Sequence, residues 1–429
     1  MAKFALIGVG SAVFGARTIG DLYLLREKLG DTTISLVDPD RERLSLVETM
    51  THRLNEKYGK PFQIEASVER EAAIEGADFV VTSPAFEREK RWKVDWDIIT
   101  AAGIKQTYGE NGGPGSLSHA LRNIPVILEI ARDVERLSPD AWVINYTNPE
   151  SRICMALDRH TDLKFIGLCH QIWEGYKLVS EVTGVDVEDL DIKAAGLNHF
   201  TFMYTIHRES TAEDLYPLFR RRYRDVLGEK QPLSCRMMDL FGMFPTAGDH
   251  HLAEMLSFGW ETQGLHGRDW QWWADFKQAY VDWIEGVRDG TKPLEEMIDG
   301  LSGERVAQMA AAIINNENGF EISMDVRNNG AIPNLPAKRI VEVPGVLSGC
   351  GASRVRMPRF PEPIAALMRK QIAVQELSVE AAVTGDRRTA LQALMLDPVV
   401  DNYAAAEHVL DQLLHAHRDL VHPGFFASA

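Results

Sequence analysis

Glycine residues near the N-terminus form a motif that could hold a dinucleotide. Gly8-Val9-Gly10-Ser11 follows an apolar stretch at 3–7 and precedes an amphipathic one. Glycines at such a turn let the backbone approach a pyrophosphate, and the next helix offers its free N–H groups. Asp38 ends the second apolar stretch, where a carboxylate accepts both ribose hydroxyls and repels a 2′-phosphate. The pattern predicts NAD binding rather than NADP binding. Val13 stands where GxGxxG has its third glycine, so an ordinary glycine turn is the alternative.

A cysteine and a histidine further along could together hold a metal ion. Cys169 follows the sixth apolar stretch, and His199 stands in Gly196-Leu197-Asn198-His199 between two stretches of strand character. A thiolate and an imidazole bind divalent metals and leave coordination positions open for substrate oxygens. Spacing alone leaves another interpretation open, because a lone cysteine is usually a small core residue and a lone histidine is often structural.

The elements that must position these residues alternate between strand and helix patterns. Strands are predicted at 3–7, 33–37, 62–66, 77–82, 141–145 and 163–168, and helices at 15–27, 40–57, 117–136 and 149–159. Such alternation gives βαβ units with right-handed crossovers. The fold class is therefore α/β, a Rossmann-like doubly wound parallel sheet like that of lactate and malate dehydrogenases. Such a sheet binds ligands at the carboxyl ends of its strands.

The pattern changes after about residue 190. Strands are predicted at 192–196 and 201–206, followed by a mainly helical region, a strand-like stretch at 320–343 and an amphipathic helical tail at 364–420. No linker or repeat separates the halves. We therefore predict an NAD-binding domain at 1–195 and a mainly helical α+β domain for metal, substrate and oligomerisation at 196–429, with a cleft between them.

The composition restricts the partners and the compartment. The net charge of −16 disfavours nucleic acid and anionic membrane surfaces as partners. No apolar run is long enough to span a bilayer. The four cysteines are far apart and form no CxxC pair, which favours a reduced cytoplasm over a disulfide scaffold.

Six motifs in series along nearly the whole chain resemble glycoside hydrolase family 4, the NAD- and manganese-dependent glycosidases. The motifs are Gly8-Val9-Gly10-Ser11, Asn145-Tyr146-Thr147-Asn148-Pro149, Gly167-Leu168-Cys169-His170, Gly196-Leu197-Asn198-His199-Phe200, Ala247-Gly248-Asp249-His250-His251-Leu252-Ala253-Glu254 and Asn329-Gly330-Ala331-Ile332-Pro333-Asn334-Leu335-Pro336. The resemblance is closest to the α-galacturonidase branch. It implies hydrolysis of α-linked, unphosphorylated hexosides or hexuronides.

The resemblance implies a reaction outside the usual two-carboxylate scheme of glycosidases. NAD⁺ takes a hydride from carbon 3 of the sugar, a base removes the proton on carbon 2, and the aglycone leaves carbon 1 by elimination. Mn²⁺ stabilises the enediolate as a Lewis acid. Water then adds and the hydride returns, so that no net oxidation results.

The same resemblance assigns roles to individual residues. Cys169 and His199 would bind Mn²⁺, and Asn148 would contact the cofactor and hydrogen-bond sugar hydroxyls near the nicotinamide. Asp249 matches the proposed base of some relatives, with a helix N-cap as the alternative. His170 stands where phosphosugar-specific relatives commonly have aspartate, which indicates an unphosphorylated sugar. It would assist departure of the aglycone, or else orient the thiolate.

Two departures from the family pattern bear on substrate charge. His250, a candidate substrate contact, replaces an arginine of the galacturonidase-like motif that could pair with a sugar carboxylate, which weakens the uronate assignment. Arg327 replaces a proline in a segment expected near the active site. It is either a compensating cation for an anionic substrate or a solvated surface arginine.

The sequence also bears on the subunit assembly and leaves two other functions open. Tryptophans gather at 260–283, which favours core or subunit contacts over sugar stacking. Relatives are dimers or tetramers, so a homodimer or homotetramer is expected. The alternative function is a plain NAD-dependent dehydrogenase of the lactate/malate type, which needs no Cys–His metal pair. A non-catalytic sugar or nucleotide sensor is a third class.

Overall fold

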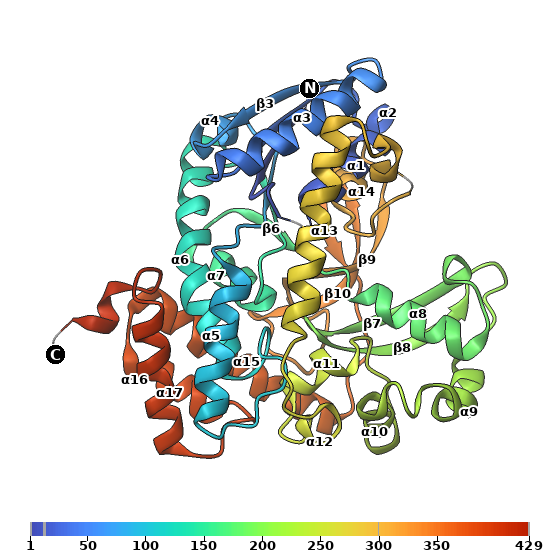
Figure 1. Cartoon of the computed structure of the whole chain (residues 1–429). Helices are drawn as coiled ribbons and strands as arrows, with labels where there is room; N and C mark the ends of the chain where they lie inside the picture. The colour runs from blue at the N-terminus through green and yellow to red at the C-terminus, as the bar shows by residue number, and fades with distance from the viewer. Residues whose placement is uncertain (1, 12–13, 299, 428–429) are drawn as a thin grey trace.

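The computed structural model describes residues 2–11, 14–298 and 300–427, and in this part of the chain eleven strands form one sheet. The strand order is β3-β2-β1-β4-β5-β6-β9-β10-β7-β8, with β11 beside β10 (Figure 1). The first six strands are parallel, and β9, β10, β7 and β8 join them in antiparallel pairs. The predicted doubly wound, Rossmann-like sheet is confirmed, and the second half of the chain extends it.

The strands are β1 (Ala2–Ile7), β2 (Thr32–Val37), β3 (Phe62–Ser67), β4 (Phe79–Thr82), β5 (Trp142–Asn145), β6 (Lys164–Gly167), β7 (Leu190–Leu197), β8 (Phe200–Arg208), β9 (Gly319–Arg327), β10 (Ile340–Ser348) and β11 (Gly351–Arg354). The helices of the first half are α1 (Gly15–Leu24), α2 (Arg26–Leu29), α3 (Arg41–Lys57), α4 (Arg70–Ile74), α5 (Arg88–Ala101), α6 (Gly113–Leu137), α7 (Glu150–His160) and α8 (Ile172–Thr183). Those of the second half are α9 (Tyr216–Leu227), α10 (Pro232–Phe241), α11 (Asp249–Leu252), α12 (Trp260–Gln263), α13 (Trp270–Asp289), α14 (Val306–Ile314), α15 (Glu362–Thr384), α16 (Arg387–Leu396) and α17 (Tyr403–Ala416). Short 3₁₀ turns lie at Val187–Asp189, Ala253–Met255, Leu294–Ile298 and Pro423–Phe426.

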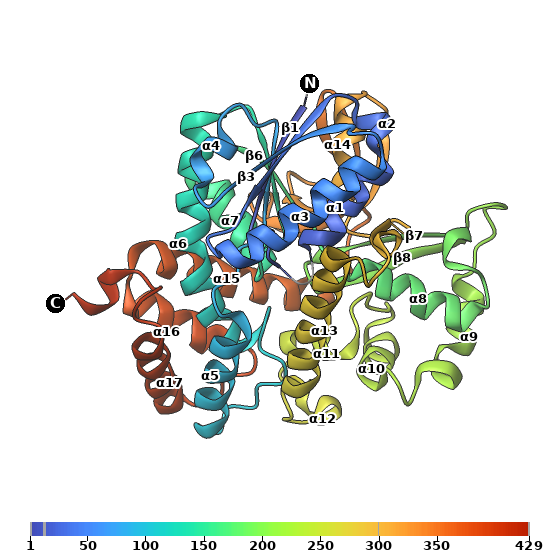
Figure 2. The same cartoon turned by 45° about the horizontal axis from the view of Figure 1, so that its top comes forward.

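Helices cover both faces of the parallel part of the sheet, and its central strands β1 and β4 are buried along almost their whole length. Side chains alternate along β1, so that Phe4 and Leu6 pack on one side and Ala5 and Ile7 on the other. Figure 2 shows α1 and α3 on one side of these strands and α4 and α6 on the other. The carboxyl ends of the strands are left open for a site.

The elements differ from the predicted ones mainly in length. The helix predicted at 15–27 divides at Leu25 into α1 and α2, and the stretch at 320–343 is two strands, β9 and β10, with an irregular loop between them. The expected domain boundary at 195 falls inside β7, so the division into two domains stays a prediction. Val13 lies outside the described residues.

Among the described helices, none has both the length and the apolar character needed to cross a membrane.

A buried ion pair connects α5 with α6, and the same carboxylate contacts the segment that follows α17. Asp95 on α5 is inaccessible to solvent and pairs with Arg122 on α6 through two contacts of 3.1 and 2.8 Å. It also lies 2.6 Å from Nε2 of His417, which follows α17. Burial raises the pKa of Asp95, but Arg122, His417 and His119 outweigh burial and lower it to about 2. The carboxylate is therefore ionised in the folded protein.

We predict that Asp95→Asn lowers the free energy of unfolding by about 3 kcal/mol at pH 7, because Arg122 is left buried without a charge partner. Urea denaturation measures this. The folded pKa lies below the ordinary value of 3.8. The stabilisation by the ionised Asp95 is therefore present above about pH 4 and is lost as the pH falls towards 2. Over that range the difference in the free energy of unfolding between the wild-type protein and the variant shrinks.

The control is Asp97→Asn on the same helix, where an exposed carboxylate pairs with Lys93. This change lowers the free energy of unfolding by less than about 0.5 kcal/mol. Equal effects of the two substitutions at pH 7 would contradict the role given to the buried pair.

Candidate functional site

A cavity of about 1170 Å³ opens at the carboxyl ends of the parallel strands. All five residues predicted to bind the cofactor line it: Gly8, Gly10, Ser11, Asp38 and Asn148. The opposite wall comes from α13, which contributes Trp273, Lys277 and Tyr280 among others. The structure thus brings the predicted cofactor residues together in a space large enough for a dinucleotide.

The glycine turn requires glycine for steric reasons. Gly8 has a φ of +88°, and a Cβ there would lie 2.7 Å from the carbonyl oxygen of Ser83. The N–H of Gly10 donates to Asp38 Oδ2 at 2.8 Å, which holds the carboxylate beside the turn. Gly15 opens α1, and a Cβ there would overlap the carbonyl oxygen of Val9. Gly15 therefore allows the close helix–strand packing that the third glycine of the motif usually allows.

Asn148 lies in the segment between β5 and α7, and a hydrogen bond orients its side chain. Its Nδ2 donates to Glu110 Oε1 at 3.1 Å, and Glu110 also pairs with Arg88. The carbonyl oxygen of Asn148 accepts from Nδ2 of Asn123 at 2.7 Å. Asn148 and Arg88 both line the cavity, so the amide is oriented within reach of a bound ligand.

Cys169 and His199 meet although they come from different halves of the chain. Cys169 follows β6, His199 stands in the turn between β7 and β8 with a φ of +61°, and Sγ lies 3.2 Å from Nε2. Burial, and after it the neighbouring His250 and His170, lower the pKa of His199 to about 3. The imidazole is therefore neutral, which is the form that ligates metals. Two donors at this separation can share one divalent ion.

Buried carboxyl groups anchor the turn that carries His199. Asn198 Nδ2 donates to Glu150 Oε2 on α7 and to Glu342 Oε2 on β10, both at 3.1 Å. Burial and repulsion from Asp325 and Glu342 raise the pKa of Glu150 well above its ordinary value. These carboxyl groups were not found by sequence analysis, because no local pattern joins residues so distant along the chain.

His251 and Glu254 extend the group around His199. The ring centroids of His199 and His251 are 3.9 Å apart, and His251 Nδ1 lies 2.8 Å from Glu254 Oε1. One ring nitrogen from each histidine and one Glu254 oxygen lie within 4.8 Å of one another, a spacing that suits a metal ion. The sequence carried a usable signal, since His251 and Glu254 stand three residues apart within the 247–254 motif.

Glu254 also fastens the glycine-rich loop before α6. Its Oε2 accepts from the N–H groups of Glu110, Asn111 and Gly112, at 2.7 Å for Asn111 and 3.1 Å for Gly112. Burial raises the pKa of Glu254 to about 8 in spite of these donors. One side chain therefore connects the loop that orients Asn148 with the histidines around the Cys169–His199 contact.

Two predicted site residues have other uses in the structure. The Asp249 carboxylate accepts from the N–H groups of Leu233 (2.6 Å) and Ser234 (2.8 Å) and from Ser234 Oγ (2.6 Å), so it caps the start of α10. The geometry thus favours the helix cap over the catalytic base. The capped helix is α10, not α11, which Asp249 itself begins. The interpretation of Arg327 as a substrate cation stays a prediction that its contacts do not favour. Its Nε lies 2.7 Å from Asp158 Oδ1, and it does not line the cavity.

His170 and His250 lie beside the Cys169–His199 contact. His170 Nδ1 is 3.6 Å from Glu304 Oε1, and about half of the side chain is exposed. The Glu304 contact, opposed by burial, raises the pKa of His170. The His250 ring lies 4.3 Å from that of His251 and 5.5 Å from that of Tyr108. Both histidines therefore remain candidates for contact with a substrate.

Comparisons with known proteins agree on one family. The protein-family model described as Family 4 glycosyl hydrolase matches residues 3–185, and the family model of its C-terminal domain matches residues 194–400. The chain is 30% identical to an α-glucosidase of Erwinia rhapontici, covering 96% of this chain and 97% of that protein. It is also 30% identical to an α-galactosidase of Bacillus subtilis (98% and 99%), and 28% identical to an α-galacturonidase of the same species (96% and 96%).

Solved structures share the fold over almost the whole chain. A Bacillus subtilis protein designated lplD and described as a glucosidase superimposes with a TM-score of 0.86 at 26% identity, covering 96% of this chain and 100% of that one. A 6-phospho-α-glucosidase from gut microorganisms, solved with NAD and Mn²⁺, also gives 0.86, at 21% identity with 98% and 99% covered. A malate dehydrogenase of Plasmodium falciparum gives 0.54 at 15% identity, covering 89% of this chain and 99% of that one.

We predict that Glu254→Ala releases the loop at 110–112, because three buried N–H groups lose their acceptor. Hydrogen exchange followed by mass spectrometry would show faster exchange in peptides that cover this loop, and the free energy of unfolding would fall by at least about 2 kcal/mol. The control is Glu261→Ala, whose side chain is half exposed and pairs only with Arg236 among the described residues. Unchanged exchange at 110–112 in the Glu254 variant would refute the role of this carboxylate.

Proposed function

Because the chain belongs to glycosyl hydrolase family 4, we propose that it is an NAD- and divalent-metal-dependent glycosidase acting on α-linked, unphosphorylated hexosides or hexuronides. The reaction proceeds by oxidation, elimination, addition of water and reduction. One observation carries the proposal: Cys169 and His199 lie 3.2 Å apart at the same edge of the sheet as the dinucleotide cavity. The α-linkage is supported by the relatives named α-glucosidase, α-galactosidase and α-galacturonidase.

The residues present fit both groups. A neutral imidazole and a cysteine sulfur form a donor set for Mn²⁺, with His251 adjoining, and the glycine turn with Asp38 suits the adenosine half of NAD. When bound, NAD⁺ supplies a reversible hydride acceptor and the divalent metal supplies a Lewis acid. Cys169 and His199 would hold the metal.

Residues of the chain itself orient the sugar and its leaving group. The Asn148 amide, fixed by Glu110, donates to a sugar hydroxyl at the nicotinamide end of the cavity. His170 stands half exposed next to Cys169 and is backed by Glu304, so it holds a proton for the departing aglycone oxygen. His250 contacts the sugar from the Tyr108 side. Asp249 has no part in this scheme, because α10 uses its oxygens.

A plain dehydrogenase of the lactate/malate type is less well supported. The malate dehydrogenase likeness has a TM-score of 0.54 and extends to the fold alone. A dehydrogenase of that type also has no use for a cysteine and a histidine held together beside the nicotinamide. The family membership and the 30% identical relatives favour the glycosidase.

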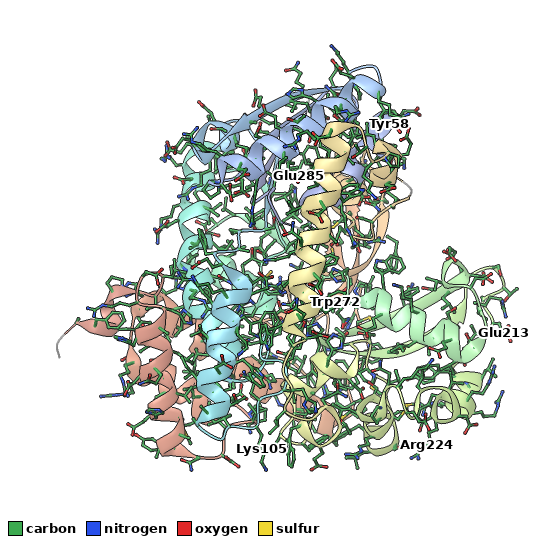
Figure 3. The ribbon with its side chains drawn as sticks, in the orientation of Figure 1. Tyr58, Lys105, Glu213, Arg224, Trp272 and Glu285 are labelled. Carbon is green, nitrogen blue, oxygen red and sulfur yellow. The ribbon has the colours of Figure 1, made fainter. Side chains whose placement is uncertain are left out.

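We further propose a cytoplasmic homodimer or homotetramer. Cys154, Cys169, Cys235 and Cys350 are all free thiols, which suits a reducing compartment. Trp272, labelled in Figure 3, is 53% exposed on the first turn of α13 and stacks on Phe276. An exposed tryptophan of this kind is typical of subunit contacts.

The test is turnover of 4-nitrophenyl α-glycosides of glucose, galactose and their uronic acids with NAD⁺, Mn²⁺ and a reductant. Nitrophenol is released without net NADH, and a substrate deuterated at carbon 2 loses deuterium to water. Omission of either NAD⁺ or Mn²⁺ abolishes release. Stoichiometric NADH formation would favour the dehydrogenase, and failure on the whole panel would favour a sensor.

We predict that Cys169→Ser weakens Mn²⁺ binding by about 10-fold or more and lowers activity in parallel, while NAD⁺ affinity stays unchanged. Calorimetric titrations with Mn²⁺ and with NAD⁺ separate the two effects. The control is Cys350→Ser, an exposed cysteine after β10. If Cys169→Ser keeps its activity and its Mn²⁺ affinity, the metal assignment is wrong.

A further inference from the structure

Arg268, just before α13, is a buried cation with no hydrogen-bonded acceptor among the described residues. The residue is 3% exposed, and its guanidinium carbon lies 3.4 Å from the ring centroid of Trp273 and 4.4 Å from that of Trp92. Within the described chain it forms no hydrogen bond and no ion pair, and its Nε and Nη1 atoms are buried without an acceptor. Arginines buried elsewhere in the protein do have acceptors, as Arg122 has Asp95.

Such a cation is unfavourable in the free protein. Burial removes the guanidinium from water and neighbouring Arg88 adds repulsion, and these outweigh the attraction of Tyr108 and Glu89, so the pKa of Arg268 falls to about 9. The aromatic faces compensate in part through cation–π attraction, but they accept none of its five N–H donors. A local arrangement that costs stability and is not compensated within the fold is typical of a binding site.

The surroundings of Arg268 join it to the candidate site. Its guanidinium carbon lies 5.8 Å from the Tyr108 ring, and the neighbours of that ring include His251 at 5.0 Å and His250 at 5.5 Å. Trp273, on which Arg268 stacks, lines the cavity together with Arg88 and Asn148. Figure 1 shows the start of α13 beside α11, where the histidines lie. Arg268 therefore stands between the histidine group and the cavity wall.

We propose that Arg268 is the specificity-determining residue for an anionic substrate and that it recognises the carboxylate of an α-linked hexuronoside. This rests on the proposed glycosidase function. A planar guanidinium matches a carboxylate in geometry, and one unpaired positive charge balances one negative charge. A phosphate dianion suits the place less well, because Arg88 is already paired with Glu110 and Glu89. Arg268 thus supplies the cation that neither His250 nor Arg327 provides.

The test compares kcat/KM for 4-nitrophenyl α-galacturonide, α-glucuronide, α-galactoside, α-glucoside and the 6-phosphates of the two neutral glycosides. The wild-type protein prefers a uronide. Arg268→Met lowers kcat/KM for that uronide by about 100-fold but for the matching neutral glycoside by less than about threefold. Arg268→Lys restores only part of the loss, because it keeps the charge without the planar donors. The control, Arg327→Met, removes an arginine that pairs with Asp158 outside the cavity.

A measurement on the wild-type protein keeps the inference testable if the Arg268 variants do not fold. Free galacturonate or glucuronate, added with NAD⁺ and Mn²⁺, raises the melting temperature more than the neutral sugar or its 6-phosphate does. If the protein preferred a 6-phosphate, the group that it recognises would be a phosphate dianion rather than a carboxylate, and the inference would be wrong. Equal losses on uronide and neutral glycoside in Arg268→Met would also overturn it, while leaving the glycosidase proposal intact. No turnover of any glycoside by the wild-type protein would instead count against the proposed function itself.

Discussion

The contact between Cys169 Sγ and His199 Nε2 depends on the addition of a second, antiparallel set of strands to a parallel sheet. β6 carries Cys169 to the carboxyl edge, and the β7–β8 turn presents His199. These segments are separated in the sheet by β9 and β10, which pair with β6 and β7 respectively. The order of strands thus determines which loops meet, and the pair of donors exists only when the whole sheet is formed.

Buried polar groups make that meeting place rigid. Asn198 joins the His199 turn to carboxyl groups on α7 and β10, and Glu254 joins His251 to the loop that orients Asn148 through Glu110. Each connection removes a polar group from water and gives it a partner, so a shift of one loop leaves buried donors unpaired. Orientation of the candidate ligands is therefore enforced by hydrogen bonds that lie outside the ligand set.

Local pattern was sufficient for the parallel strands, the glycine turn and the five residues that line the cofactor cavity, because each depends on neighbours in sequence. It was insufficient where a role depends on a distant partner. Asp249 looked like a cap of its own helix or a base, whereas it caps α10. Arg327 looked like a free cation, whereas it pairs with Asp158 on α7. Glu254 and Arg268 were missed because their roles depend on residues distant in sequence: Glu254 accepts from the 110–112 backbone, and Arg268 lacks a hydrogen-bonded acceptor among the described residues.

The wall formed by α13 has a consequence for how the protein keeps its dinucleotide. Trp273, Lys277 and Tyr280 face the cavity from a helix in the second half of the chain, and Lys277 is paired with Glu89 on α5, which also lines the cavity. A nucleotide in this cavity would thus be held by contacts from both halves of the chain. Retention of this kind suits a catalytic cycle that regenerates NAD⁺, because the cofactor is not consumed and turnover does not require its release.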